Sequence, residues 1–74
     1  MSIFPNPANS VLNIPNKQDQ FQNAITEIIN YFGQRILSES FSNQIDMSHF
    51  LSGVYIITIK TNSGELYHAK FVKE

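Results

Sequence analysis

The last third of the chain consists of two apolar, β-branched runs separated by a short polar cluster. The first run covers residues 54–61, the second covers residues 65–72, and Asn62-Ser63-Gly64 lies between them. Two such runs joined by Asn and Gly predict a β-hairpin. Nearly every position of the first run is apolar, so this strand is expected to be central in its sheet and covered on both faces.

Five shorter segments upstream carry the same kind of pattern, with turn residues about every ten positions. These predicted strands are residues 3–4, 11–14, 24–31, 35–41 and 44–46, while residues 16–23 form a polar connection and residues 47–51 form one tight turn. Many short strands with regular turns are typical of two packed sheets. We therefore predict an all-β fold, a small antiparallel β-sandwich of about seven short strands with no helix beyond one turn.

Residues 24–36 also fit a helical pattern. Apolar side chains recur there at helical spacing, namely Ile25, Ile28, Ile29, Phe32 and Ile36. Two observations favour strands instead. The segment is rich in β-branched residues, and Gly33 near its middle would cost a helix about 1 kcal/mol relative to alanine. A hairpin that turns at residues 31–34 makes use of this glycine, because glycine adopts positive φ without steric cost.

Composition narrows the classes of function. The 74-residue chain has no cysteine and a net charge of −1, and its basic residues are spread along it: Lys17, Arg35, Lys60, Lys70 and Lys73. Nucleic-acid binding needs a concentrated basic face, so none is expected. No apolar run approaches the roughly 20 residues that span a bilayer, so membrane insertion is not expected. Residues 2–20 are polar and interrupted by proline, so no signal peptide is expected within them.

The sequence offers little for catalysis. His49 and His68 stand alone, without the short spacings that place two histidines on one metal ion. Residues 62–65 (Asn-Ser-Gly-Glu) are better explained as a turn than as a nucleophile motif. Asp46 and Glu39 are typical of scattered surface acids, and a domain this small has little volume for a cleft. We expect no enzymatic activity, no metal site and no cofactor.

Other positions have structural explanations that leave room for a functional one. Pro5 and Pro7 fix φ and hold the entering chain extended, while Asn6 can hydrogen-bond to nearby backbone. Gly33 and Gly53 are expected to serve the backbone conformation. The ring of Tyr55 is expected to pack in the core and its hydroxyl to find a hydrogen-bond partner.

Lys70 and Lys73 allow two interpretations. At a spacing of three on a strand they point to opposite faces, so they cannot form one basic patch. Edge lysines commonly oppose sheet-to-sheet aggregation. Alternatively, the final strand is an exposed edge that a partner grips, with the lysines beside it.

Taken in order, these elements resemble the type A C-terminal sorting domain of cargo proteins of the type IX (Por) secretion system of Bacteroidetes. The resemblance covers essentially the whole chain. It is carried by Phe4-Pro5-Asn6-Pro7, residues 11–14, residues 27–36, residues 45–48, Leu51-x-Gly53-Val54-Tyr55 and Lys70-Phe71-Val72-Lys73. Two places depart from the pattern: Thr26 occupies a position that is usually apolar, and His49-Phe50 stands where a smaller or polar pair is common.

The resemblance implies a small Ig-like β-sandwich that serves as an export signal. Residues 1–74 would be the sorting domain of a larger cargo protein that folds in the periplasm. An outer-membrane translocon would recognise the domain, and a surface sortase would cut before it, leaving the cargo at the cell surface or secreted. The residues expected to carry recognition are Pro5, Asn6, Pro7, Gly33, Leu51, Gly53, Val54, Tyr55, Lys70, Phe71, Val72 and Lys73. The alternative is an Ig-like accessory module that binds carbohydrate or a protein partner at the cell surface. That module would need a row of exposed aromatic side chains or a charged loop cluster, and the sequence shows neither clearly.

Overall fold

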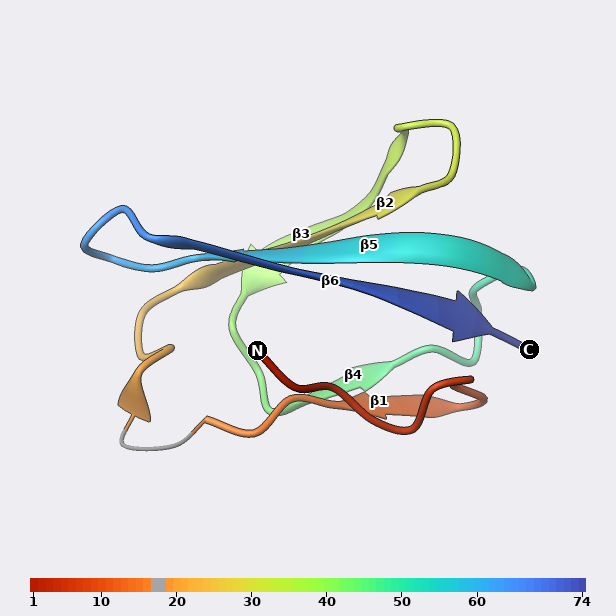
Figure 1. Ribbon diagram of the computed structural model, residues 1–74, viewed down its shortest axis with the longest axis horizontal. Helices are drawn as coiled ribbons and strands as arrows, with labels where there is room; N and C mark the ends of the chain where they lie inside the picture. The colour runs from red at the N-terminus through yellow and green to blue at the C-terminus, as the bar shows by residue number, and fades with distance from the viewer. Residues whose placement is uncertain (17–18) are drawn as a thin grey trace.

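Two antiparallel sheets pack face to face in the computed structural model, which describes residues 1–16 and 19–74 (Figure 1). The smaller sheet pairs β1 (Val11–Asn13) with β4 (Gln44–Asp46). The larger sheet has the order β3-β2-β5-β6, from β2 (Ile25–Asn30), β3 (Arg35–Ser40), β5 (Gly53–Lys60) and β6 (Leu66–Lys73). The predicted all-β sandwich is confirmed. One predicted strand is not formed, because Phe4 makes only an isolated bridge to Asn13.

The segment that fitted both a helix and a hairpin is a hairpin. β2 and β3 pair antiparallel, and the chain turns between them at Tyr31–Gln34. The N–H of Asn30 donates to the carbonyl of Gln34 at 2.9 Å, and the N–H of Gly33 donates to the carbonyl of Asn30 at 3.0 Å. Gly33 has a φ of +84°, which explains why glycine stands at this turn.

The C-terminal hairpin also forms as predicted, with each strand boundary within one residue of the expected one. The N–H of Thr61 donates to the carbonyl of Glu65 at 2.8 Å across the turn. β5 is central, between β2 and β6, but the expectation that both its faces are covered is wrong. Tyr55 and Ile57 are buried, whereas Ile56 on the opposite face is 37% exposed, because the smaller sheet covers one face only.

The core lies between the two sheets and is completed by residues outside the strands, Phe21 among them. Its buried members are Ala8, Leu12, Ile14, Phe21, Ala24, Ile28, Ile45, Met47, Tyr55, Ile57, Ile59 and Phe71. The ring of Phe21 packs 5.2 Å from the ring of Phe41 and 5.2 Å from that of Tyr67. The polar connection predicted for residues 16–23 therefore contains a core aromatic. Residues 17 and 18 of that connection lie outside the described residues.

The connection from β4 to β5 contains the single tight turn that the sequence predicts. The N–H of Phe50 donates to the carbonyl of Met47 at 3.0 Å. Within residues 1–16 and 19–74, no helix is long and apolar enough to cross a membrane.

Candidate functional site

Most residues expected to carry recognition come together at one end of the larger sheet. In the β5–β6 register Gly53 lies opposite Lys73, Val54 opposite Val72, and Tyr55 opposite Phe71. Figure 1 shows this end on the right, where β5 begins, β6 ends and the N-terminal segment turns back. Positions that are far apart in sequence thus form one region of the folded domain.

Residues 5–8, which we call the N-terminal segment, close the outer edge of β6. The N–H of Ala8 donates to the carbonyl of Val72 at 2.7 Å, and the N–H of Glu74 donates to the carbonyl of Ala8 at 2.9 Å. The side-chain oxygen of Asn6 accepts a hydrogen bond from the N–H of Val72 at 3.0 Å. The expectation that the final strand offers an open edge is therefore wrong for residues 72–74, because the N-terminal segment already occupies it.

Two prolines flank Asn6, the residue whose side chain accepts the hydrogen bond from Val72. Both peptide bonds that precede them, Phe4-Pro5 and Asn6-Pro7, are cis. Ala8, which follows, is fully buried and bridges Lys73 in parallel. The Pro-Asn-Pro element is thus part of the folded sandwich.

Tyr55 anchors the start of β5 as predicted. Its ring lies 5.2 Å from the ring of Phe50 and stacks on Phe71 at 5.6 Å with an interplanar angle of 19°. Its hydroxyl donates to the carbonyl of Leu51 at 2.7 Å. This bond fixes the loop before β5, because it ties the backbone of Leu51 to a buried side chain.

The two C-terminal lysines lie on opposite faces, as the spacing predicts, and in different environments. Lys70 is exposed on the outer face of β6. Lys73 lies on the inner face with only 8% of its surface exposed, and its ammonium group donates to the carbonyl of Glu74 at 2.7 Å. Lys73 is therefore not a solvated edge lysine of the kind that opposes aggregation. Its aliphatic stem packs inside while its charge reaches a backbone oxygen.

Three large apolar side chains stand in solvent at the same end of the domain. Tyr31 and Phe32, at the β2–β3 turn, are 80% and 86% exposed, and Leu51, in the loop before β5, is 83% exposed. We call these three residues the apolar tip. Tyr31 and Phe32 contact each other edge to face, with ring centroids 6.2 Å apart and planes at 78°. Tyr31, Phe32 and Leu51 also line one small surface pocket of about 160 Å³.

The turn that carries Tyr31 and Phe32 is held by the side chain of Asn30. The side-chain oxygen of Asn30 accepts hydrogen bonds from the N–H groups of Phe32 and Gln34, both at 2.9 Å. Its side-chain amide donates to the side-chain oxygen of Gln34 at 2.8 Å. These bonds order the turn although both aromatic rings face solvent.

Sequence reasoning placed Gly33 and Leu51 in this region but missed Tyr31 and Phe32. Both were assigned to the hairpin turn, as residues beside its glycine. The signal that identifies them is their position: turns usually carry small or polar residues, so two adjacent aromatics at a turn tip are unusual.

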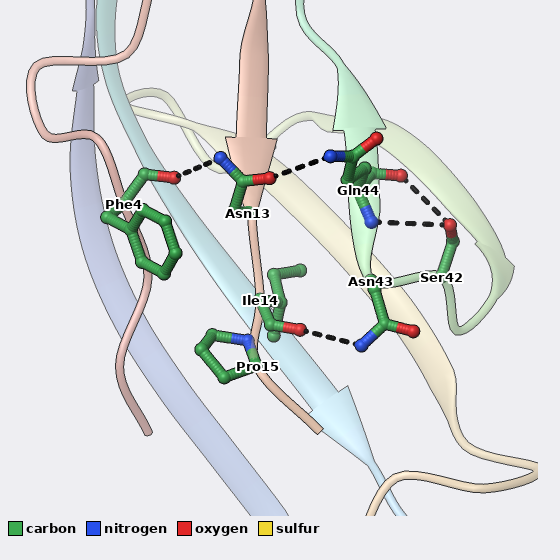
Figure 2. A pocket seen from close by; sticks show the side chains of 7 residues that line it. All are labelled: Phe4, Asn13, Ile14, Pro15, Ser42, Asn43 and Gln44. Carbon is green, nitrogen blue, oxygen red and sulfur yellow. Dashed lines mark hydrogen bonds between the residues drawn. The ribbon is translucent and has the colours of Figure 1, made fainter. Parts of the chain in front are cut away.

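A larger pocket lies elsewhere, where β1 ends and β4 begins (Figure 2). It has a volume of about 470 Å³ and is lined by Phe4, Asn13, Ile14, Pro15, Ser42, Asn43 and Gln44. Its amides are already engaged with protein groups. Asn13 donates to the carbonyl of Phe4 at 3.2 Å and accepts from Gln44 at 3.0 Å, and Asn43 donates to the carbonyl of Ile14 at 3.2 Å. The described residues that line this pocket carry no ionisable side chain.

The histidines and carboxylates form local contacts. Asp46 accepts a hydrogen bond from the N–H of Ser48 at 2.9 Å, and hydrogen bonds from the side chain and backbone of Ser48 hold the pKa of Asp46 below its ordinary value. His49 contacts the hydroxyl of Ser48 at 3.1 Å, and His68 contacts the hydroxyl of Thr58 at 3.1 Å. Among the described residues, no group of three metal-binding side chains comes together.

The protein is a small β-sandwich. One end of its larger sheet carries exposed apolar side chains, and the N-terminal segment is hydrogen-bonded to β6 at the same end. The chain belongs to the family of secretion system C-terminal sorting domains, whose family model matches residues 2–74. Comparison with curated proteins gave no match. Membership confirms the resemblance seen in the sequence. It identifies the domain as a tail that type IX secretion machinery recognises, in a family of sorting signals rather than of enzymes.

Proposed function

We propose that residues 1–74 are the C-terminal sorting domain of a larger cargo protein and direct it through the outer-membrane translocon of the type IX system. The cargo folds in the periplasm before it crosses, and a surface sortase then separates it from the domain, leaving it anchored or released. The observation that carries this proposal is the family match across residues 2–74.

The arrangement of the candidate residues supports recognition of a folded domain rather than of a linear peptide. Asn6 meets Val72 only when the two ends of the chain come together in the folded domain. A receptor that binds this end of the domain therefore distinguishes the folded domain from the unfolded chain.

A passenger assay tests the proposal. A fluorescent protein with a signal peptide is fused upstream of residues 1–74 and expressed in a host that has the type IX system. We expect the passenger at the cell surface or in the medium, whereas the same passenger without residues 1–74 stays in the periplasm. Periplasmic retention of the complete fusion would show that the domain is not a sufficient sorting signal.

A truncation gives the second arm of that assay. Removal of residues 71–74 deletes the buried ring of Phe71 and the backbone groups that pair with Asn6 and Ala8. We expect export to fail while passenger fluorescence persists in the periplasm. Normal export of the truncated fusion would argue that this end of the domain is dispensable.

The accessory-module alternative gains no support from the surface. Sugar rings stack on open aromatic faces, whereas Tyr31 and Phe32 lie at 78° to each other and form no flat platform. We therefore do not propose carbohydrate binding.

A further inference from the structure

The apolar tip continues onto the outer face of the larger sheet. Val54 lines the same small pocket as Tyr31, Phe32 and Leu51. It pairs directly with Val72, and both valines alternate along their strands with the buried residues Tyr55 and Phe71, which places them on the opposite, outer face. The result is one continuous apolar surface, which we call the tip surface: Tyr31, Phe32, Leu51, Val54 and Val72.

Lys70 is the cation on the β6 side of the tip surface, whereas Arg35, which follows the β2–β3 turn, pairs with Glu27 at 3.4 Å. Lys70 lies on the same outer face, two positions before Val72, and no ion pair involves it in the part of the chain that the structure describes. The residues that line the pocket of the apolar tip carry no charge. A partner that fits here is therefore apolar at its centre and acidic at the side that meets Lys70.

We propose that the tip surface is the docking surface of this domain, which inserts into an apolar recess of a protein of the type IX machinery whose rim places a carboxylate opposite Lys70. The proposal rests on the proposed function and adds to it the contact face and the chemistry of the partner. We assign the partner to the type IX machinery because that machinery recognises the sorting domains of this family.

The geometry of the tip surface suits protein docking. Exposed aromatic residues supply much of the binding energy in protein interfaces, particularly where they fill a pocket on the partner. The hydrogen bonds of Asn30 hold the backbone of Phe32 and Gln34 before any partner arrives, which lowers the cost of ordering the turn on binding. The pocket of about 160 Å³ beside the rings has the size to receive a side chain from the partner. The exposed rings and the pocket beside them therefore form a surface that is complementary to one with a recess and a protruding side chain.

Export of the passenger fusion, with the domain altered at its surface, tests the proposal. In the first variant Tyr31→Ser and Phe32→Ser remove both rings. Because these rings face solvent, the thermal midpoint of the isolated domain should stay within a few degrees of the original. We expect roughly tenfold or greater loss of exported passenger, as truncation of an aromatic anchor costs in other interfaces.

The matched control is Leu66→Ser, which removes an apolar side chain that is 56% exposed at the far end of β6. A second pair tests the charge: Lys70→Glu is expected to reduce export, whereas Lys60→Glu, also on the outer face but at the far end of β5, is not. Equal effects of the two members of either pair would overturn the corresponding part of the proposal.

The outcomes separate this inference from the function on which it rests. If the passenger with the unaltered domain is not exported, the proposed function fails. If it is exported and the variant without Tyr31 and Phe32 is exported equally well, the function stands and the docking surface is wrong.

Two further measurements address other occupants. The purified domain is mixed with vesicles of phosphatidylethanolamine and lipopolysaccharide and recovered by flotation, and its self-association is measured by sedimentation equilibrium. We expect neither vesicle binding nor a dimer. Vesicle binding that is lost with Tyr31 and Phe32 would assign the surface to a membrane, and a dimer lost with them would assign it to a second copy; either result overturns the proposal.

Discussion

The side chain of Asn6 accepts a hydrogen bond from the backbone N–H of Val72 at 3.0 Å, although 66 positions separate the two residues. An edge strand normally has neighbouring N–H groups open to other chains. Here a side chain and the backbone of Ala8 occupy the groups of residues 72–74. The Pro-Asn-Pro element and the Lys-Phe-Val-Lys element, which the sequence presents as separate, are thus two halves of one contact.

Replacement Asn6→Ala should destabilise the domain by about 1 kcal/mol, because the N–H of Val72 loses its acceptor. Urea unfolding followed by far-ultraviolet circular dichroism measures this change. Asn62→Ala provides the control, since Asn62 is an exposed turn residue, and the side-chain hydrogen bonds of its turn join Thr61, Ser63 and Glu65. Equal effects of the two substitutions would mean that the bond to Val72 contributes nothing to stability.

Replacement Thr26→Val should stabilise the domain by about 1 kcal/mol. Thr26 is buried, and among the described residues its hydroxyl is the buried side-chain polar group without a hydrogen-bond partner. Valine keeps the β-branched shape and removes the unsatisfied group. Thr58→Val is the control, because the hydroxyl of Thr58 contacts His68 and is not buried. A loss of stability in the Thr26 variant would indicate that this hydroxyl has a partner such as a bound water.

The two C-terminal lysines should respond differently to alanine. Lys73→Ala removes a buried aliphatic stem and is expected to cost about 1 kcal/mol. Lys70→Ala removes an exposed side chain and should leave the free energy of unfolding nearly unchanged. Lys73→Met, which keeps most of the stem, should recover most of the loss. If methionine is as damaging as alanine, the charge of Lys73 matters more than its packing.

Asp46 should contribute a part of the acid sensitivity of the domain. Hydrogen bonds from Ser48 lower the pKa of Asp46 in the folded state below its ordinary value of 3.8. The ionised carboxylate therefore stabilises the fold above about pH 3.8, and that stabilisation is lost as the pH falls through and below this value. The effect is measured as the thermal midpoint at several pH values from about 6 down to about 2.5, a range that brackets this titration. The thermal midpoint of Asp46→Asn should fall less steeply with acid than that of the original chain, and equal slopes would contradict this role of Asp46.

Strands and turns followed from local sequence, because their signals are local. Gly33 between β-branched runs and Asn62-Ser63-Gly64 between apolar runs each predicted a turn, and each turn forms. The sequence did not show that only one face of β5 is covered by a second sheet. The run from Val54 to Thr61 is apolar at most positions, and periodicity does not tell a second packed layer from an outer face available to a partner.

Contacts between distant parts of the chain could not be predicted either, because a local sequence pattern does not show which distant residues meet. Nothing near Phe21 marks it as a core residue, since its partners Phe41 and Tyr67 come from distant parts of the chain. The burial of Lys73 depends on the inner face of β6, and the closed edge depends on where the N-terminal segment returns. The exposure of Tyr31 and Phe32 was missed because the pattern of a turn says where the backbone reverses and not which side chains remain in solvent.

The contact between Ala8 and residues 72–74 also sets an order of events in folding. Bringing together groups so distant in the chain carries the largest loop-closure cost in the domain, so this contact forms most readily after the sheets are in place. During synthesis, which begins at the N-terminus, residues 5–8 are made long before residues 72–74. The N-terminal segment therefore stays unpaired until the last residues of the domain are available. Completion of the fold thus depends on the part of the domain that is made last.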